Sequence, residues 1–147
     1  MKQKEILLIE DSLADIRLMA ELLVENKEYY NLNVVETGTQ AIDFLNKKGN
    51  YKTAPRPDII ILDLNLPQTD GHQILKFVKN RDSFKTIPVI VLTNSTSKDD
   101  IDKAYASNAN CYIAKPTDLN EFISVIDSIE SFWLEKAVLP NNPKISI

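Results

Sequence analysis

The sequence predicts an α/β protein in which five parallel strands alternate with five helices. Short apolar runs recur along the 147 residues, and longer stretches of helical periodicity separate them. Three of the runs consist almost entirely of Ile, Leu and Val, which is typical of parallel strands covered on both faces. A chain of this length suits one domain, so a single open sheet with helices on both sides is expected.

The strands are predicted directly from the apolar runs. They are Ile6–Ile9, Leu32–Val35, Ile59–Leu62, Ile87–Leu92 and Cys111–Ala114. A strand–helix order repeated five times, with right-handed crossovers, leaves few topologies. We expect a doubly wound (βα)5 sheet with strand order 2-1-3-4-5.

Polar residues mark the expected helix starts. Ser12-Leu-Ala-Asp15 and Ser97-Lys-Asp-Asp100 have the S-x-x-D form of a capping box. Asp70 is the predicted N-cap of the third helix and Thr117 that of the fifth. Residues 1–135 are expected to form the domain, and residues 136–147, with two prolines, an irregular tail.

Composition narrows the function classes. The net charge of −4 and the scattered basic residues give no reason to expect a nucleic-acid partner. The N-terminal apolar run is too short for a signal peptide or a membrane span. Cys111 is the only cysteine, so neither a disulfide framework nor a cysteine zinc site is expected. A reduced, cytoplasmic protein is predicted.

Chemically useful side chains follow four of the strands. They are Glu10 and Asp11 after the first, Asp63 after the third, Thr93 after the fourth and Lys115 after the fifth. In the expected strand order these ends converge at one edge of the sheet, where sites form in such folds. Clustered carboxylates repel one another unless a cation joins them, and an all-oxygen site favours Mg2+.

A metal alone does not explain the lysine and the threonine. An ammonium, a hydroxyl and a metal around one carboxylate suit a phosphoryl group arriving there. Asp63 is therefore the predicted nucleophile, forming an aspartyl phosphate. The alternative is that each of these residues is separately structural or solvated.

The same residues carry a family resemblance. "LLIEDS", "IIILDLNLPQTDG", "IPVIVLTNS" and "CYIAKP" are similar, in order and spacing, to the motifs of the receiver domain of bacterial two-component response regulators, which has the flavodoxin-like fold. The resemblance implies that Asp63 is the phosphoacceptor and that Glu10 and Asp11 are the acidic pair at Mg2+. It also implies that Asn65 gives its backbone carbonyl to the metal.

The resemblance assigns the remaining residues of the site as well. Thr93 would bond a phosphoryl oxygen, Lys115 would pair with it, and Tyr112 would be the aromatic switch that follows Thr93. The Lys115–Pro116 peptide is expected to be cis. Asn94 departs from the small residue usual in the family, and is expected to crowd the entrance.

Partners follow from the resemblance. A histidine kinase would donate the phosphoryl group, and a histidine phosphotransfer protein could receive it. The protein is not expected to be an enzyme in the ordinary sense, although it would catalyse its own phosphorylation and dephosphorylation. "GNYKTAPRPDIIILDLNLP" and "ESFWLEKAVLP" resemble the single-domain, dimeric regulators paired with phytochrome-type histidine kinases. No output domain is expected after the fifth helix.

Two helical faces are predicted to bind partners. In the first helix, the expected core residues are Leu13, Ile16, Ala20 and Leu23. The expected kinase-docking residues are Ser12, Ala14, Asp15 and Leu18, while Leu18 and Leu22 form an apolar pair off the core face.

In the fifth helix, the apolar arc is wider than a packed surface helix needs. Its expected core residues are Leu119, Phe122, Ile123, Ile126, Ile129 and Trp133. A symmetric dimer through the fourth helix, fifth strand and fifth helix is predicted, with Val125, Phe132 and Trp133 in the contact. The tail, with Val138, Leu139, Ile145 and Ile147, would extend this contact. The alternative is that the tail folds back and covers the apolar surface within one chain.

Three rival functions remain open at this point. A flavin binder on the same fold would need a phosphate loop where Glu10 and Asp11 stand. A dehalogenase-type phosphatase would need a second acid where Asn65 stands. A pseudo-receiver would only bind partners. His72, the single histidine, is expected to be an exposed or capping residue rather than a metal ligand.

Overall fold

A computed structural model describes residues 3–24 and 28–140 of the chain. The strands are β1 (Lys4–Ile9), β2 (Tyr30–Val35), β3 (Ile59–Leu62), β4 (Val89–Thr93) and β5 (Cys111–Ala114). The α-helices are α1 (Leu13–Val24), α2 (Gly38–Asn46), α3 (Gly71–Lys79), α4 (Lys98–Ala106) and α5 (Leu119–Ile129). A 3-10 helix, η1 (Gly49–Tyr51), precedes β3, and a π-helix, η2 (Glu130–Lys136), continues α5.

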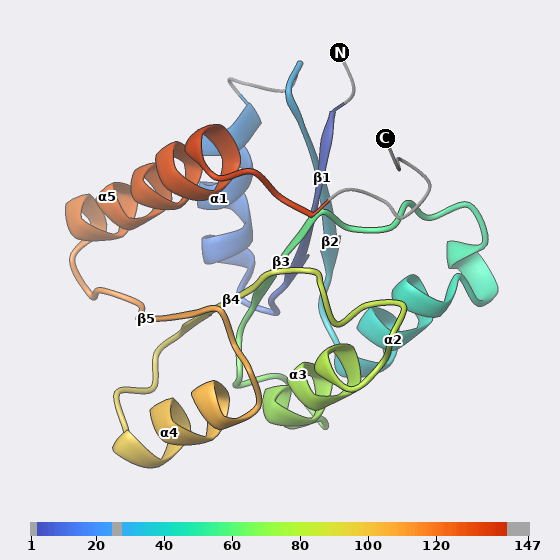
Figure 1. Ribbon diagram of the computed structural model, residues 1–147. Helices are drawn as coiled ribbons and strands as arrows, with labels where there is room; N and C mark the ends of the chain where they lie inside the picture. The colour runs from blue at the N-terminus through green and yellow to red at the C-terminus, as the bar shows by residue number, and fades with distance from the viewer. Residues whose placement is uncertain (1–2, 25–27, 141–147) are drawn as a thin grey trace.

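The five strands form one parallel sheet in the order β2-β1-β3-β4-β5, which confirms the predicted fold class. Figure 1 shows α1 and α5 together on one face of the sheet and α2, α3 and α4 on the other. The switch in winding direction lies between β1 and β3, so the carboxyl ends of these two strands border a crevice.

Each face of the sheet has its own apolar core. Along β1, Leu7 and Ile9 pack toward α2 and α3, whereas Ile6 and Leu8 pack toward α1 and α5. Strand β3 alternates in the same way, and all four of its residues are buried. This two-sided burial explains why both strands are continuous apolar runs. It also fixes the height at which each strand ends, and therefore the position of the polar residues that follow.

Three of the four predicted N-cap residues cap their helices, Ser12 among them, since its Oγ accepts a hydrogen bond from Asp15 N at 3.3 Å. Asp70 Oδ1 accepts a hydrogen bond from His72 N at 2.9 Å, and Ser97 Oγ accepts one from Asp100 N at 3.0 Å. The fifth helix is capped by Asp118 rather than by the predicted Thr117. Both residues are good N-caps, but the Asp118 carboxylate is the group that reaches an orphan amide, that of Glu121.

The predicted core faces of α1 and α5 are partly wrong at their first residues. Leu13 is 59% exposed and Leu119 is 61% exposed, and each is the first residue of its helix. Met19 takes the place of Leu13 in the core of α1. Leu18 and Leu22, predicted to lie off the core face, are half-buried against the same core.

The π-helix changes which side chains are buried at the end of α5, so the buried face differs from the predicted one. A hydrogen bond from Ala137 N to Phe132 O spans five residues, which is the π-helical pattern. The wider turn places Leu134, five residues after Ile129, in the core, and both side chains are buried. Trp133, predicted to be a core residue, is therefore only half-buried. Phe132 is 55% exposed and meets the Trp133 ring edge-on.

The tail was predicted either to extend a dimer contact or to fold back over the apolar surface within one chain, and the residues after the π-helix bear on this choice. Lys4 Nζ donates to Leu134 O and fastens the end of η2 to the start of β1. Beyond Lys136 the described chain is not helical, and Leu139 is half-buried against the α1–α5 core, whereas Val138 is 95% exposed. The described tail thus covers part of this core within one chain. Ile145 and Ile147 lie outside the described residues.

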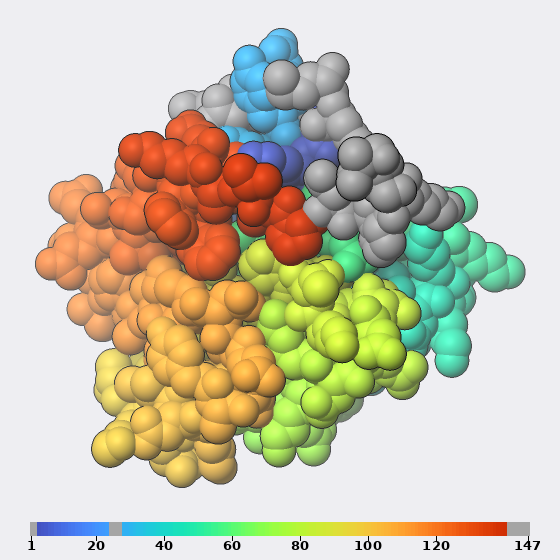
Figure 2. Space-filling view, in the orientation of Figure 1, coloured from blue at the N-terminus to red at the C-terminus, as the bar shows by residue number. Residues whose placement is uncertain are grey.

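One side of the molecule is built from α4, β5 and α5 (Figure 2). None of the helices in the described part of the chain has the length and apolar character needed to cross a lipid bilayer.

Candidate functional site

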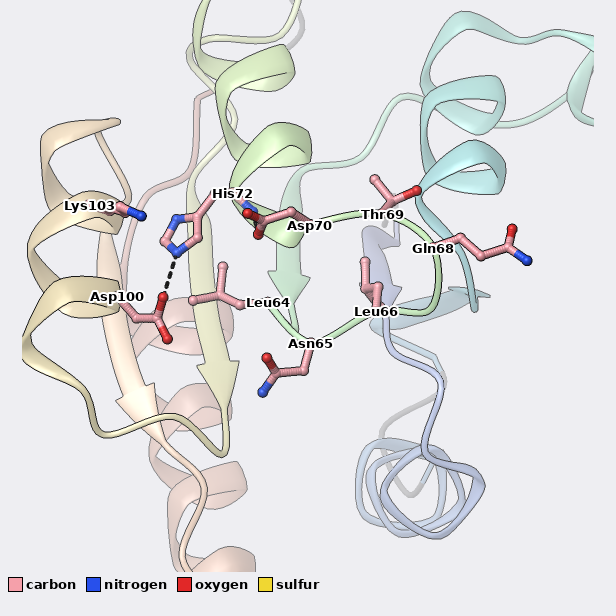
Figure 3. A pocket seen from close by; sticks show the side chains of 9 residues that line it. All are labelled: Leu64, Asn65, Leu66, Gln68, Thr69, Asp70, His72, Asp100 and Lys103. Atoms are coloured by element: carbon pink, nitrogen blue, oxygen red, sulfur yellow. Dashed lines mark hydrogen bonds and ion pairs between the residues drawn. The ribbon is translucent and has the colours of Figure 1, made fainter.

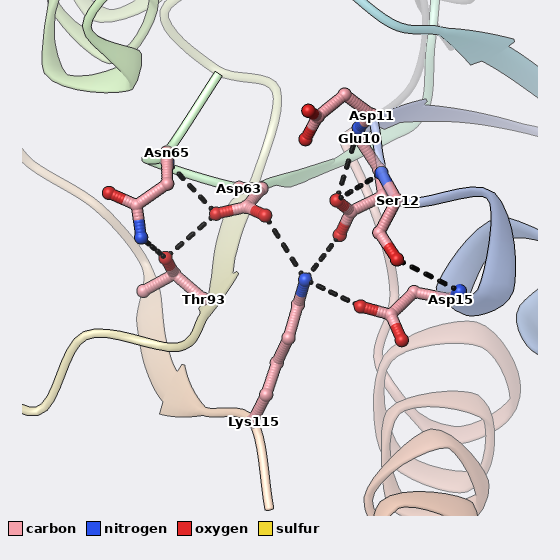
Figure 4. Close-up of polar contacts among 8 residues, drawn as sticks. All are labelled: Glu10, Asp11, Ser12, Asp15, Asp63, Asn65, Thr93 and Lys115. Carbon is pink, nitrogen blue, oxygen red and sulfur yellow. Dashed lines mark hydrogen bonds and ion pairs between the residues drawn. The ribbon is translucent and has the colours of Figure 1, made fainter. Parts of the chain in front are cut away.

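The predicted strand-end residues meet at one edge of the sheet. Glu10 follows β1, Asp63 follows β3, Thr93 ends β4 and Lys115 follows β5. Figure 4 shows Asp63 at the centre, with Thr93 and Asn65 on one side and Lys115 and Glu10 on the other. Glu10, Asp63, Thr93 and Lys115 are all buried. The structure therefore brings together the polar residues that the sequence places at the ends of separate strands.

Asp63 is buried, with 4% of the residue exposed, and three hydrogen-bond donors hold its carboxylate in place. Its Oδ1 accepts from Thr93 Oγ1 at 2.7 Å and from the backbone N–H of Asn65 at 2.9 Å. Its Oδ2 accepts from Lys115 Nζ at 3.0 Å. Burial acts to raise the pKa of Asp63, but these donors outweigh it and lower the pKa below the ordinary value. The group is consequently an oriented carboxylate anion at neutral pH.

Lys115 is the cation of the site. Its Nζ contacts Glu10 Oε1 at 2.5 Å, Asp15 Oδ2 at 2.8 Å and Asp63 Oδ2 at 3.0 Å. An ammonium has three protons, so these carboxylates use its full donor capacity. Burial opposes the charged form, but the bonds to Asp15 and Glu10 outweigh it and raise the pKa of Lys115.

Glu10 is the most deeply buried acid of the cluster, at 1% exposed. Its Oε2 accepts from the backbone N–H groups of Asp11 and Ser12, both at 3.1 Å. Burial nevertheless raises the pKa of Glu10 to about 7, against the lowering effect of its bonds to Lys115 and Ser12. A bound cation would favour its charged form.

The acidic cluster fits a divalent metal ion. Carboxylate oxygens of Glu10, Asp11 and Asp63 all lie within 4.8 Å of one another. Asp11 is exposed, so the cluster opens toward solvent on that side. Oxygen donors of this kind suit a hard cation that keeps several water ligands.

The backbone around Asp63 is shaped by one glycine. Gly71 N donates to Leu64 O at 2.9 Å, which ties the start of α3 to the loop after β3. A Cβ at position 71 would lie 2.5 Å from Leu64 Cα and 2.7 Å from Asp63 O. Only glycine allows α3 to approach Asp63 this closely, so this residue fixes the loop that carries Asn65.

Tyr112 and the loop after β4 are joined to each other. The Tyr112 hydroxyl donates to Ser95 O at 2.8 Å, and Ser95 Oγ donates to Asp100 Oδ2 at 2.5 Å. Ser95 stands two residues beyond Thr93, so its hydrogen bond with the Tyr112 hydroxyl links the loop after β4 to Tyr112 in β5. Asn94, between them, is exposed.

His72 was predicted to be an exposed or capping residue, and its side chain is neither. It is buried, its Nε2 lies 3.0 Å from Asp100 Oδ1, and its Nδ1 has no hydrogen-bond partner among the described residues. Figure 3 shows it between α3 and α4, where it lines a pocket with Asn65, Asp70 and Lys103. Asp100 was expected to close a capping box, but its side chain reaches His72 and Ser95 instead.

Asp15 was predicted from the sequence to be a kinase-docking residue, but in the structure its side chain belongs to the site around Lys115. In a capping box its carboxylate would return to the Ser12 N–H. Glu10 occupies that N–H, so only half of the box forms, from Asp15 N to Ser12 Oγ at 3.3 Å. The diverted Asp15 carboxylate binds Lys115. Of the other predicted docking residues, Ala14 is exposed and Leu18 half-buried.

One backbone expectation is wrong. All peptide bonds between described residues are trans, including Lys115–Pro116. The trans form is the more stable isomer for most X-Pro bonds. Lys115 N donates to Thr93 O at 2.7 Å, so the pairing of β5 with β4 continues to the proline.

Comparison with known proteins decides the family. The model of the response regulator receiver domain matches residues 6–127 of this chain. The chain belongs to the receiver domain family. This receiver is 43% identical to the response regulator Rcp1 of Synechocystis sp. over 93% of both chains. It is 34% identical to a probable methanogenesis regulatory protein, FilR2 of Methanothrix harundinacea, over 88% of this chain and 83% of that one.

Solved structures of receivers superpose closely on this one. The Mn2+-bound form of Rcp1 has a TM-score of 0.91 and 43% identity, and the match covers 94% of this chain and 99% of that chain. The phosphorylated cyanobacterial phytochrome response regulator RcpA has a TM-score of 0.92 and 41% identity, covering 95% and 100%.

Family membership settles the general role of the chain. It is a receiver of two-component signalling that is phosphorylated on an aspartate, its partner is a histidine kinase, and its acidic cluster is compatible with a divalent metal ion. The flavin-binder and dehalogenase-type interpretations are thereby excluded.

Proposed function

We propose that Asp63 accepts the phosphoryl group from a phosphohistidine of the kinase in a Mg2+-dependent reaction. An oxygen of the Asp63 carboxylate attacks phosphorus, and the new O–P bond forms as the P–N bond breaks. The electron pair of that bond leaves on the imidazole nitrogen, which takes up a proton. No oxidant or further reactant is needed.

The orientation of Asp63 is the observation that carries this proposal. Asp63 is the acid on which Thr93, the Asn65 N–H and Lys115 converge, and these donors keep it ionised in a buried position. After transfer, Lys115 and the Thr93 hydroxyl are in place to bind phosphoryl oxygens and to neutralise their charge. The same groups would assist attack by water, so the receiver would also catalyse its own dephosphorylation.

Mg2+ is the proposed metal. Glu10, Asp11 and Asp63, together with the backbone carbonyl of Asn65, would hold it. When bound, the ion supplies positive charge that offsets the repulsion between the phosphoryl oxygens and the acidic cluster. The existence of a Mn2+-bound form of the relative Rcp1 supports a divalent ion as the metal of this receiver.

The proposed output is a conformational change centred on Thr93 and Tyr112. Movement of Thr93 toward the phosphoryl group would pull on the loop that includes Ser95. The bond from the Tyr112 hydroxyl to Ser95 O would pass this displacement to the ring, on the α4–β5–α5 side of the molecule. Transfer of the group to a histidine phosphotransfer protein is the other proposed output.

The proposed donor is a phytochrome-type histidine kinase. The similarity to Rcp1 and to RcpA, described as a cyanobacterial phytochrome response regulator, supports this class of kinase. Docking through the start of α1, by Ser12, Ala14, Asp15 and Leu18, would bring the phosphohistidine to the open side of the cluster. The reaction would take place in the cytoplasm.

A homodimer is also proposed. Phe132 is 55% exposed beside half-buried Trp133 and Val125, and a two-fold contact there would cover these side chains. The tail, residues 136–147, would border the contact.

Labelling at Asp63 tests the central proposal. The protein is incubated with acetyl phosphate and MgCl2, and intact mass is measured before and after acid treatment. The wild type is expected to gain one phosphoryl group that acid treatment releases, and Asp63→Asn is expected to gain none. Asp82→Asn, which neutralises an exposed acid paired with Lys85, is the matched control and should label like the wild type. Full labelling of Asp63→Asn would exclude Asp63 as the acceptor.

A further inference from the structure

Asp15 is the acid of the site to which neither the acceptor chemistry nor the metal cluster gives a role. Its Oδ2 lies 2.8 Å from Lys115 Nζ, yet it does not belong to the group of carboxylates that can share a metal ion. Its side chain is 22% exposed, whereas that of Lys115 is 3% exposed. It also differs in origin, because Glu10 and Asp63 follow strands and Asp15 belongs to the first turn of α1.

The local sequence frees the Asp15 carboxylate for this contact. Glu10 Oε2 already accepts from the N–H of Ser12, the group to which an acid at this position of a capping box would return. The Asp15 backbone is still fixed by its own N–H, which donates to Ser12 Oγ at 3.3 Å. Figure 4 shows the Asp15 side chain extending from α1 toward Lys115, away from the cap.

All three protons of the Lys115 ammonium are committed before a phosphoryl group arrives. Two of the bonds go to the buried Glu10 and Asp63, and the third goes to Asp15. A phosphoryl oxygen on Asp63 that pairs with Lys115 must take one of these donors. Asp15 gives up its bond most easily, because its carboxylate can turn into water.

We propose that Asp15 is a positioning residue that competes with the phosphoryl group for Lys115. The proposal rests on the proposed function, in which Asp63 is the acceptor. In the unphosphorylated protein Asp15 accepts the third N–H of the Lys115 ammonium, and in the phosphorylated protein it competes with a phosphoryl oxygen for that N–H donor. Asp15 thereby weakens phosphoryl binding. Its release also frees the first turn of α1, where the kinase is proposed to dock.

Beryllofluoride, an analogue of the phosphoryl group, provides the test. Its dissociation constant is measured by isothermal titration calorimetry in saturating MgCl2, for the full chain and its variants. Asp15→Asn is expected to bind about 3- to 10-fold more tightly than the wild type. Asp15→Glu, which keeps the carboxylate, should return the dissociation constant toward that of the wild type. Glu21→Gln removes an exposed acid further along α1 and should leave the dissociation constant unchanged.

The second measurement asks whether Asp15 acts through Lys115. In a Lys115→Met background, Asp15→Asn should change the dissociation constant by less than about 2-fold, because the shared donor is gone. An undiminished gain there would assign the effect to charge repulsion at a distance and overturn the proposal. Unchanged or weaker binding by Asp15→Asn alone would overturn it as well, even if Lys115→Met does not fold. Failure of the proposed function looks different, since the wild type itself would then not bind beryllofluoride.

Discussion

Replacing Lys115 by methionine should show how much the fold depends on this one cation. The substitution preserves most of the buried side-chain volume and removes the ammonium from Glu10, Asp15 and Asp63. Removing one partner of a buried ion pair costs about 3–5 kcal/mol, because an uncompensated charge stays in the interior. Two of the three carboxylates, Glu10 and Asp63, are 1% and 4% exposed and meet this condition.

Two effects limit the loss of stability in Lys115→Met. Asp15 can turn into solvent, and Glu10, whose pKa burial already raises to about 7, can take up a proton. We therefore expect Lys115→Met to lower the free energy of unfolding by about 3 kcal/mol without metal, near the lower end of that range. For a domain of this size this is a substantial part of the total stability.

Magnesium should restore part of what the lysine supplied. A ligand that binds only the folded state at 100 times its dissociation constant adds about 2.7 kcal/mol, and every tenfold tightening adds about 1.4 kcal/mol. The variant lacks the competing ammonium, so it should bind Mg2+ more tightly. We expect MgCl2 to stabilise Lys115→Met by at least about 1 kcal/mol more than it stabilises the wild type.

Urea unfolding followed by circular dichroism, with and without MgCl2 and above pH 7, measures both quantities. Lys79→Met is the matched control, because Lys79 Nζ donates to the carbonyl oxygens of Lys85 and Ile87 and to Asn110, and to no carboxylate. The decrease in the free energy of unfolding caused by Lys79→Met should not depend on Mg2+. The reasoning is refuted if Lys115→Met loses less than about 1 kcal/mol, or if MgCl2 stabilises it no more than the wild type.

Three further substitutions probe the surfaces and the end of α5. Ala14→Glu, at an exposed position, should slow phosphoryl transfer from the kinase by about tenfold or more while leaving labelling by acetyl phosphate unchanged; equal slowing of both would argue against docking at α1. Phe132→Glu should yield a monomer by sedimentation velocity that still labels at Asp63, and a wild type that sediments as a monomer would disprove the dimer. Leu134→Ala should cost about 2–4 kcal/mol in urea unfolding and Phe132→Ala about 0.5 kcal/mol or less, the reverse of the order that a regular α-helix predicts.

The sequence was most informative where one pattern has one physical cause. Apolar runs such as Ile59–Leu62 must be covered on both faces, so the strands, their order and the convergence of their polar ends could be predicted. Local pattern was weaker where a side chain had two possible partners. The aspartates at positions 15 and 100 fit a capping box, but a buried lysine and a buried histidine attract them more strongly. The π-helix has no periodic pattern of its own, so the burial of Leu134 could not be foreseen.

The charges of the site explain why metal and phosphoryl group depend on each other. Glu10, Asp15 and Asp63 contact a single ammonium, and Asp11 lies beside Glu10 and Asp63, so the pocket carries excess negative charge when its acids are ionised. A phosphoryl group on Asp63, the proposed acceptor, would add further negative charge, which the low-dielectric surroundings would oppose. A divalent ion at the acidic cluster would offset that charge. It would also take over part of the charge compensation that Lys115 gives to Glu10 and Asp63. Lys115 can then exchange its bond to Asp15 for a bond to a phosphoryl oxygen.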